Sequence, residues 1–387
     1  MNTLIQDISI TSAAGAVVSD GEHSWQDLSA FGFGYQCPDV VNDVVAQMQR
    51  GGLSSRVLMS RPMLQLVEQL AQLTPEDLTM TYLCNSPDEA FEGAIKLARG
   101  HNPQRREIVV VGQADFGCMT YSRAMSWGGC NAADGWGVAV DLAFVPFAEI
   151  AALEQTVTAR TLAVVVNPLE QLPELLLLGR EQAQQIRQVA DRHGALLIAC
   201  ELQTFGRCEG LFHSLVSGLS PDILVYGEAL GGGVLPIGAY TARRCVNESV
   251  YGGRNLALHG STTAGNPASC AAASAALKQM AARTEHEVIR RFAEVTSIAA
   301  ERLRRVLAGS GIRVSTGPAA LQLTLPGPSA AALAERLRQH GLLVWQRGNA
   351  LRLSAPLLMT VSQWSDSLTV VVDFMKHTQA NTDKELV

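Results

Sequence analysis

The stretch Leu224-Val225-Tyr226-Gly227-Glu228-Ala229-Leu230-Gly231-Gly232-Gly233 joins an apolar run to a glycine-rich loop. The run begins at Ile223 and is apolar throughout, which is typical of a short strand buried on both faces. The three consecutive glycines indicate a loop whose backbone takes conformations that side chains disfavour. Glu228 places a carboxyl group just after the end of the predicted strand.

The same kind of strand recurs along the chain. Short apolar, largely β-branched runs occupy residues 106–111, 161–166 and 196–199. Between them, residues 89–98 and 180–193 place apolar side chains three or four positions apart, which predicts helices with one buried face. Strands that alternate with helices predict an α/β domain with a mainly parallel sheet covered by helices on both sides.

The pattern changes after Pro267. Residues 268 to about 307 are rich in Ala, Glu and Arg, which predicts one long helix, and short strand-like runs follow it. This change predicts a second, smaller α+β domain built from the C-terminal third and the N-terminal arm. The predicted boundaries are 1–44 for the arm, 45–275 for the large domain and 276–387 for the small domain.

The bulk composition excludes several classes of protein. A net charge of −6 without a cluster of Lys and Arg argues against a nucleic-acid surface. The N-terminus lacks the basic and apolar regions of a signal peptide, and no apolar run is long enough to span a membrane. The 8 cysteines form no C-x-x-C pair, which favours free thiols in a reducing cytoplasm. We therefore expect a cytoplasmic protein.

Several motifs resemble, in order, those of the class III aminotransferases that depend on pyridoxal phosphate (PLP), the acetylornithine, ornithine and ω-amino type. They lie at 18–41, 82–99, 194–210, 220–239, 259–267 and 351–357. The resemblance covers most of the chain and implies the PLP-transferase fold type I, with a seven-stranded type of sheet. It also implies a dimer, because this family builds its active sites across a subunit interface.

The resemblance breaks down at the residue that carries the family's chemistry. The family reads Gly-Lys-Ala-Leu-Gly-Gly-Gly where this chain has Glu228, and that lysine holds PLP as a Schiff base. A carboxylate cannot condense with an aldehyde. The chain has four lysines, at 96, 278, 376 and 384, and Lys96 is interpreted as a solvated helix residue.

Of two positions that the resemblance places around the cofactor ring, one departs from the family and the other matches it. Cys200 stands where the resemblance implies an aspartate beside the pyridine nitrogen, and a thiol is a poor partner for a pyridinium. Gln203 matches the residue beside the ring hydroxyl. The adjacent Glu201 is expected to point to the opposite face of its strand.

The phosphate-binding turn is also altered. The family's Ser-Gly-Thr-Glu-Ala becomes Ser86-Pro87-Asp88-Glu89-Ala90, so Pro87 removes a backbone donor and Asp88 adds an anion. Residues of these types near a helix start are also typical N-capping residues. Thr262 matches the threonine that a neighbouring subunit gives to the phosphate in this family.

Two further positions allow alternative interpretations. The family's ring-stacking aromatic aligns with Asp115, although a shift of one residue would let Phe116 serve. Arg352 matches the arginine that binds a substrate carboxylate in many members, but it is equally interpretable as a structural ion-pair partner. Arg207 is interpreted as structural.

Together these changes predict a pocket that has become acidic, with Asp88, Asp115, Cys200 and Glu228 converging on it. We expect no bound PLP and no metal, and a preference for a small amine or amino acid. The first hypothesis is a pseudo-aminotransferase acting as a partner or scaffold subunit, in a homodimer or in a heterodimer with an aminotransferase-like subunit. The second is a PLP-independent enzyme that uses Glu228, Asp88 or Asp115 as acid and base. The third is an ordinary PLP transaminase.

Overall fold

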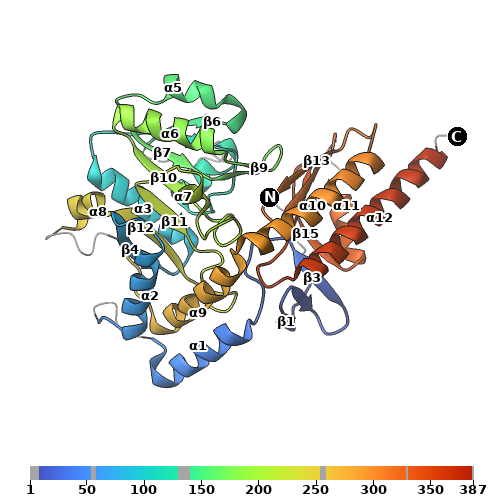
Figure 1. Ribbon diagram of the computed structural model, residues 1–387, viewed down its shortest axis with the longest axis horizontal. Helices are drawn as coiled ribbons and strands as arrows, with labels where there is room; N and C mark the ends of the chain where they lie inside the picture. Colours follow the sequence, from blue (N-terminus) through green and yellow to red (C-terminus); the bar gives the residue numbers. More distant parts are fainter. Residues whose placement is uncertain (1–7, 54–57, 130–139, 253–258, 328–329, 386–387) are drawn as a thin grey trace.

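The computed structural model describes residues 8–53, 58–129, 140–252, 259–327 and 330–385, apart from the side chains of residues 286 and 378–385. Two seven-stranded sheets organise the chain. Figure 1 shows them in two lobes, a large α/β lobe and a smaller lobe that contains both ends of the described chain. The predicted fold class, type I with a second α+β domain, is confirmed.

The large sheet has the strand order β4-β12-β11-β10-β7-β5-β6. All neighbours from β11 to β6 are parallel, and β12 is antiparallel to both β11 and β4. The strands are β4 (Leu78–Cys84), β5 (Glu107–Val111), β6 (Asp141–Val145), β7 (Thr161–Val166), β10 (Leu196–Cys200), β11 (Ile223–Tyr226) and β12 (Gly238–Arg243). A separate two-stranded ribbon pairs β8 (Leu169–Glu170) with β9 (Leu176–Leu177).

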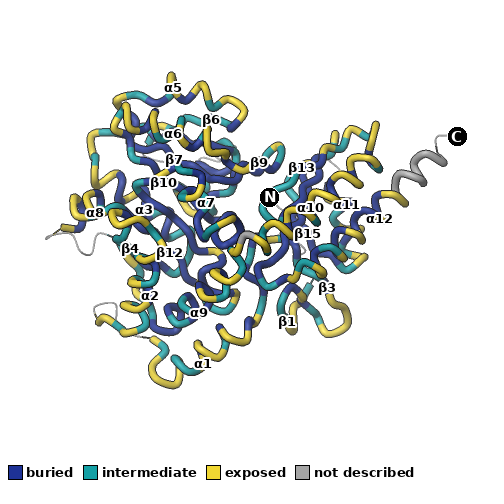
Figure 2. The backbone as a smooth tube through the Cα atoms, in the orientation of Figure 1, coloured by how far each residue is buried: buried dark blue, intermediate teal, exposed yellow. Residues whose placement is uncertain are grey.

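Both faces of the large sheet are buried because successive side chains of each strand enter different cores. In β7, Val164 and Val166 join one core, whereas Ala163 and Val165 join the other. The second core is covered by α3 (Pro87–His101), which contributes Phe91 among other apolar residues. Figure 2 shows the strands buried in the centre of the lobe and exposed residues on its outer helices.

The remaining helices of the large lobe surround these cores. They are α1 (Pro38–Gly51), α2 (Arg61–Gln72), α4 (Thr120–Met125), α5 (Leu153–Thr156), α6 (Arg180–His193), α7 (His213–Val216), α8 (Arg244–Tyr251) and α9 (Pro267–Arg283). Two short 3-10 helices lie at Ser126–Gly129 and Phe147–Ala152. The predicted helix at 180–193 is confirmed.

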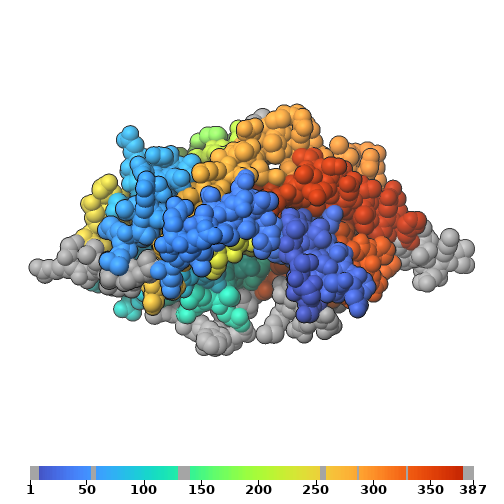
Figure 3. Space-filling model, turned by 90° about the horizontal axis from the view of Figure 1, so that it is seen from below, coloured from blue at the N-terminus to red at the C-terminus, as the bar shows by residue number. Residues whose placement is uncertain are grey.

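The second sheet has the order β1-β2-β3-β15-β16-β14-β13 and joins segments from both ends of the chain. Its strands are β1 (Ser12–Ala14), β2 (Val17–Ser19), β3 (Ser24–Leu28), β13 (Arg313–Gly317), β14 (Ala320–Thr324), β15 (Leu342–Arg347) and β16 (Ala350–Ser354). Figure 3 shows the dark-blue N-terminal segment lying against the orange and red C-terminal part. The boundaries proposed for the arm and the two domains (1–44, 45–275 and 276–387) fall within α1 (Pro38–Gly51) and α9 (Pro267–Arg283), and the division stays a proposal.

The single helix expected from 268 to about 307 is instead two helices. α9 ends at Arg283 and α10 (His286–Val306) begins three residues later. The prediction was wrong here because both helices have good propensity, and Thr284 and Glu285 carry no Pro or Gly signal for a break. The small lobe is completed by α11 (Ala330–Gln339) and α12 (Val361–Glu385). None of the helices in the described residues is long and apolar enough to cross a membrane.

The glycine-rich loop after β11 is tightly enclosed. A Cβ on Gly231 would lie 1.8 Å from the carbonyl oxygen of Leu235, and one on Gly233 would lie 1.7 Å from that of Gly34. Gly233 also has a φ of +68°, which disfavours any side chain. The loop therefore requires its glycines for packing, whatever chemistry the site performs.

Candidate active-site cleft

The candidate residues gather at the carboxyl ends of the parallel strands. Glu228 lies two residues after β11, Gln203 follows β10 and Asp115 follows β5. In open α/β sheets this edge is the usual place for a ligand. The sheet topology thus brings together residues that are more than 100 positions apart in the sequence.

The backbone of Asp115 is fixed by two amide side chains. Asn167 and Gln203 each donate from a side-chain nitrogen to the carbonyl oxygen of Asp115, both at 3.2 Å. Asn167 also donates to Oε1 of Gln203 at 2.7 Å. The Asp115 carboxylate accepts the backbone N–H of Gly117 at 3.0 Å. This network fixes the backbone of Asp115 and engages the side chain of Gln203 within the protein.

Glu228 is the most unusual group in the cleft. Its side chain is exposed, yet surrounding protein desolvates the carboxylate enough to raise its pKa, and the charges of Asp115 and Asp88 raise it further. Arg207 and Arg352 oppose this effect without reversing it. Among the described residues, no side chain or backbone N–H donates to this carboxylate. Glu228 is therefore an exposed carboxylate just after β11 that is available to a ligand.

The pKa of the Asp115 carboxyl group is also raised above its ordinary value. Desolvation raises the pKa of its carboxyl group, and Asp88 adds to the increase, whereas the hydrogen bond from Gly117 and the charge of Arg352 lower it. Three carboxylates and two arginines thus influence one another across the cleft. Within the described residues, no group of three or more His, Cys, Asp and Glu side chains could hold a metal ion.

Arg352 is held in a stack that crosses between the lobes. Its guanidinium carbon lies 4.3 Å from the ring centroid of Phe31 and 4.2 Å from that of Trp345. Trp345 stacks on Trp127 with centroids 5.6 Å apart, and Arg347 lies 4.4 Å from the Trp127 centroid. The interlobe stack (Arg347, Trp127, Trp345, Arg352 and Phe31) therefore joins the N-terminal arm, the small lobe and the large lobe.

The two cleft arginines are both buried, and burial lowers the pKa of Arg352 to about 9 and that of Arg207 to about 10. Arg352 donates to Oε1 of Gln171 at 2.7 Å. Arg207 donates to the carbonyl oxygens of Ala355 and Gly32, both at 2.7 Å. These bonds support the interpretation of Arg207 as a structural residue. They also give Arg352 a structural role, in addition to any role in binding a ligand.

The start of α3 is capped by Ser86, whose hydroxyl accepts the N–H of Glu89 at 3.1 Å. Asp88 does not cap the helix as expected. Its carboxylate instead accepts the backbone N–H and the thiol of Cys118, at 2.9 and 3.0 Å. The carboxylate of Asp88 therefore occupies the backbone N–H of Cys118 beside the N-terminus of α3, and helix N-termini are where anions normally bind.

Two predicted pocket residues do not face the cleft. The ring of Phe116 has no exposed surface and packs against Phe91 in the core under α3. Cys200 is fully buried in the same core, and burial raises the pKa of its thiol well above the ordinary value. Phe116 therefore offers no face for stacking, and Cys200 does not contribute to the acidic pocket. Glu201 points the other way, as expected, and accepts the N–H of Ser214 at 2.5 Å.

Thr262 lies in an exposed turn whose neighbours are anchored to the large lobe. Asn85 donates to the hydroxyl of Ser261 at 2.6 Å and accepts from that of Thr263 at 3.1 Å. Thr262 itself is exposed between these two anchors. The turn thus presents Thr262 outward in a defined conformation.

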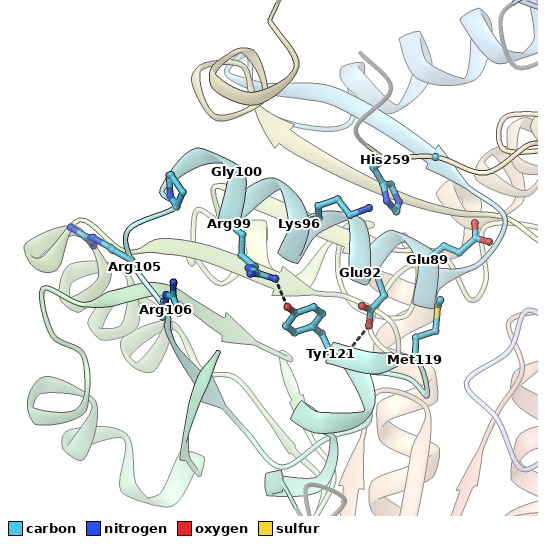
Figure 4. A pocket seen from close by; sticks show the side chains of 12 residues that line it. Glu89, Glu92, Lys96, Arg99, Gly100, Arg105, Arg106, Met119, Tyr121 and His259 are labelled. Carbon is cyan, nitrogen blue, oxygen red and sulfur yellow. Dashed lines mark hydrogen bonds between the residues drawn. The ribbon is translucent and has the colours of Figure 1, made fainter. Parts of the chain in front are cut away.

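A separate hollow of about 590 Å³ runs along the outer face of α3. Figure 4 shows Glu92 pointing to Tyr121, and Lys96 pointing toward His259. Glu92 accepts the backbone N–H groups of Tyr121 and Ser122, at 2.7 and 3.1 Å. Lys96 is exposed, as expected, and lies about 12 Å along the helix from Asp88. It does not replace the missing lysine.

Three cleft residues were missed by the sequence reasoning, namely Asn167, Cys118 and Trp127. Asn167 follows a predicted strand, so its position at the same sheet edge was a usable signal. Cys118 and Trp127 follow Asp115 in irregular segments without a periodic pattern. Trp127 has a φ of +61°, an uncommon conformation for an aromatic residue, which no sequence signal indicated.

A family model for class III aminotransferases matches residues 5–375, and the chain belongs to this family. The ornithine aminotransferase of Bordetella pertussis is 32% identical over 351 residues, covering 87% of this chain and 82% of that protein. The acetylornithine aminotransferase of Mycobacterium leprae is 30% identical over 386 residues, covering 98% of this chain and 93% of that protein.

The fold matches solved structures as well. An amine transaminase from an uncultivated Pseudomonas species, in its PLP-bound internal aldimine form, superposes with a TM-score of 0.83 at 22% identity. The match covers 94% of each chain. Membership of this PLP-dependent family contradicts our expectation that the chain has no cofactor. PLP is the cofactor that these findings indicate.

The residues present fit that cofactor only in part. Gln203 lies at the sheet edge, and the side chain of Glu228 is exposed. However, position 228 offers no amine for a covalent link, and Asp88 holds the N–H of Cys118 beside the start of α3. The covalent form seen in the neighbour therefore does not fit at Glu228, and we derive no chemical step through it.

Proposed function

We propose that this chain is a class III aminotransferase homologue that does not transaminate and that serves as an aminotransferase-like subunit of a dimer. The observation that carries the proposal is Glu228, an exposed carboxylate just after β11 in the place of the Schiff-base lysine. PLP bound here would be held without a covalent link to residue 228.

The proposed partner role draws support from the turn around Thr262. The family resemblance gives this threonine to the active site of a neighbouring subunit, and here it is exposed between two residues anchored by Asn85. A subunit that has lost its own covalent chemistry could thus still complete the site of its partner. The partner is either a second copy of this chain or an active relative.

The loss of transamination is tested with purified protein, PLP, and ornithine or acetylornithine as amino donor to a 2-oxo acid. We expect no turnover and no PLP adduct that borohydride fixes to the unaltered chain. Turnover by the unaltered chain, or a borohydride-stable PLP adduct on it, would overturn the proposal.

A Glu228→Lys variant distinguishes the effect of residue 228 on PLP binding from the effect of the residues around it. A PLP adduct that borohydride fixes only in this variant would show that Glu228 alone prevents the covalent link. If the variant binds PLP no better than the parent, the Asp88–Cys118 contact also limits the phosphate end. Glu228→Gln is the matched control, because it removes the charge without supplying an amine.

The partner role is tested by light scattering and by mixing. The chain should be dimeric alone or with an active class III relative encoded in the same genome. Mixed dimers should retain the relative's activity, and Thr262→Val should reduce it. A monomer that forms no dimer with either partner contradicts this part of the proposal.

A second candidate function is acid–base catalysis on a small amine or amino acid. It is favoured by the raised pKa values of Glu228 and Asp115, two carboxyl groups that face one cleft with Asp88 nearby. Arg352 would face the carboxylate of an amino acid. Chemical conversion of an amine by the chain alone, lost in Glu228→Gln, would favour this candidate over the subunit role.

We also propose a cytoplasmic location. Every cysteine that the structure describes is free, which is common in a reducing compartment. Fluorescence localisation of the tagged chain in its native cell tests this, and a periplasmic or extracellular signal would contradict it.

A further inference from the structure

A second cavity, separate from the acidic cleft, lies between the two lobes. It has a volume of about 410 Å³, within the size range of pockets for small ligands. Residues of α7, β9, α10 and the β13–β14 turn line it, and Figure 1 shows these elements meeting between the lobes. Such interfaces are frequent places for ligand binding.

The lining is mainly apolar and comes from both lobes. Ile289 and Phe292 come from α10, Pro318 from the β13–β14 turn, and Leu357 from the segment after β16. Leu177 and Val216 form part of the large-lobe side and are both exposed, at 39%. An apolar ligand body would cover these side chains.

Two arginines supply charge to the cavity. Arg283, at the end of α9, donates to the carbonyl oxygen of Met359 at 2.7 Å, and its guanidinium carbon lies 5.4 Å from the Phe292 centroid. Arg207 also lines the cavity. It is 6% exposed, and its buried Nε has no hydrogen-bond partner among the described residues.

The balance of charge favours an anion. The positive charge of Arg283 lowers the pKa of Arg207, so the two guanidiniums are close enough to repel each other. The negative charge of Glu228 has the opposite effect and raises the pKa of Arg207. The pKa of Arg283 is lowered by burial. Glu209, which also lines the cavity, is exposed, so solvent and salt screen its negative charge.

We propose that this interlobe cavity binds a small monocarboxylate with an apolar chain, whose carboxylate pairs with Arg283. The apolar chain lies against Phe292, Ile289 and Leu357. Because the ligand contacts both lobes, its binding stabilises their observed arrangement. The site is independent of the proposed function, since no group of the acidic cleft except Arg207 lines it.

Isothermal titration of the full chain with octanoate, octylamine and octanol tests the proposal. These probes share one apolar chain and differ in the charge of the head group. Octanoate should bind saturably, at one site, at least tenfold more tightly than either of the others. Equal binding of octylamine, or no binding of octanoate, would overturn the proposal.

Three variants locate the site. Arg283→Gln keeps a donor for Met359 but removes the charge, and should weaken octanoate binding about tenfold or more. Ala293→Trp should block the cavity, because Ala293 is an exposed part of its lining. Arg290→Gln is the matched control on α10, outside the lining, and should bind octanoate like the parent. Unchanged affinity in both Arg283→Gln and Ala293→Trp would place octanoate elsewhere and refute the assignment.

Discussion

The carboxylate of Asp88 accepts two hydrogen bonds from Cys118, one from its backbone N–H at 2.9 Å and one from its thiol at 3.0 Å. This pair ties the first turn of α3 to the loop that follows β5. It also raises the pKa of the Cys118 thiol to about 11, mainly through the hydrogen bond to Asp88. The loop approaches so closely that a Cβ on Gly117 would lie 2.1 Å from Oδ1 of Asp88.

Replacing Asp88 by Ala should make Cys118 more reactive. Without the carboxylate, the thiol pKa falls toward its ordinary value, and the thiolate fraction at pH 8 rises roughly tenfold for each unit of decrease. The alkylation rate of Cys118 by iodoacetamide, followed by peptide mass spectrometry, measures this. Cys245, another exposed free cysteine, is the internal reference. An unchanged ratio of the two rates would contradict the assigned role of Asp88.

Glu228→Gln should stabilise the protein at neutral pH. The folded-state pKa of Glu228 is raised above its ordinary value of 4.5, so the folded chain binds this proton more tightly than the unfolded chain does. The stability of the parent therefore falls as pH rises from 4.5 through the folded-state pKa. Gln removes that loss, so the variant should melt at a higher temperature at pH 7 and show little difference below pH 4.5. A variant that is less stable at pH 7 would show that the attraction of Arg207 and Arg352 outweighs desolvation.

Trp345→Ala should separate the interlobe stack. Trp345 contacts both the Arg352 guanidinium and the Trp127 ring and is buried, so its loss should cost about 3–5 kcal/mol of unfolding free energy. Trp345→Phe keeps a ring and should cost about 1–2 kcal/mol. Chemical denaturation followed by circular dichroism gives both values. Equal losses in the two variants would mean that the ring itself contributes little.

Gly233→Ala should destabilise the folded protein far more than Gly348→Ala. Both glycines have positive φ values, +68° and +55°, but a Cβ at 233 meets the Gly34 carbonyl oxygen, whereas one at 348 meets nothing within 4 Å. Backbone strain alone costs about 1–2 kcal/mol, so Gly348→Ala should lose about that much. Gly233→Ala should lose more than about 3 kcal/mol or fail to fold. Thermal melting of the two variants makes the comparison, and equal losses would refute the packing argument.

The order of strands and helices could be predicted from the sequence, because each buried strand is a short apolar run and each covering helix has a 3.6-residue pattern. These patterns located β5, β7, β10 and β11 and α6 within one or two residues. The break between α9 and α10 was not readable, because Thr284 and Glu285 disrupt no local preference. That break is decided by where the two lobes meet.

The cleft was predictable in part. Glu228, Asp115 and Asp88 do approach one another, because residues at the carboxyl ends of neighbouring strands share one edge. Phe116 and Cys200 are instead buried in the core under α3, where neither side chain has surface exposed to a ligand. The expectation of no cofactor rested on the missing lysine, on Cys200 and on the altered turn at Pro87-Asp88. It was wrong because the chain belongs, over residues 5–375, to a family that depends on PLP.

The sequence by itself determined the family, the alternation of strands and helices, and the absence of a lysine at position 228, because these depend on residue identity and local periodicity. Only the tertiary structure decided that Asp88 pairs with Cys118, that Arg352 is stacked between Phe31 and Trp345, and that Arg207 and Arg283 border one interlobe cavity. The Asp88–Cys118 pair joins segments 30 residues apart within the large lobe. The contact of Arg352 with Phe31 and the cavity beside Arg207 and Arg283 instead depend on how the two lobes pack together.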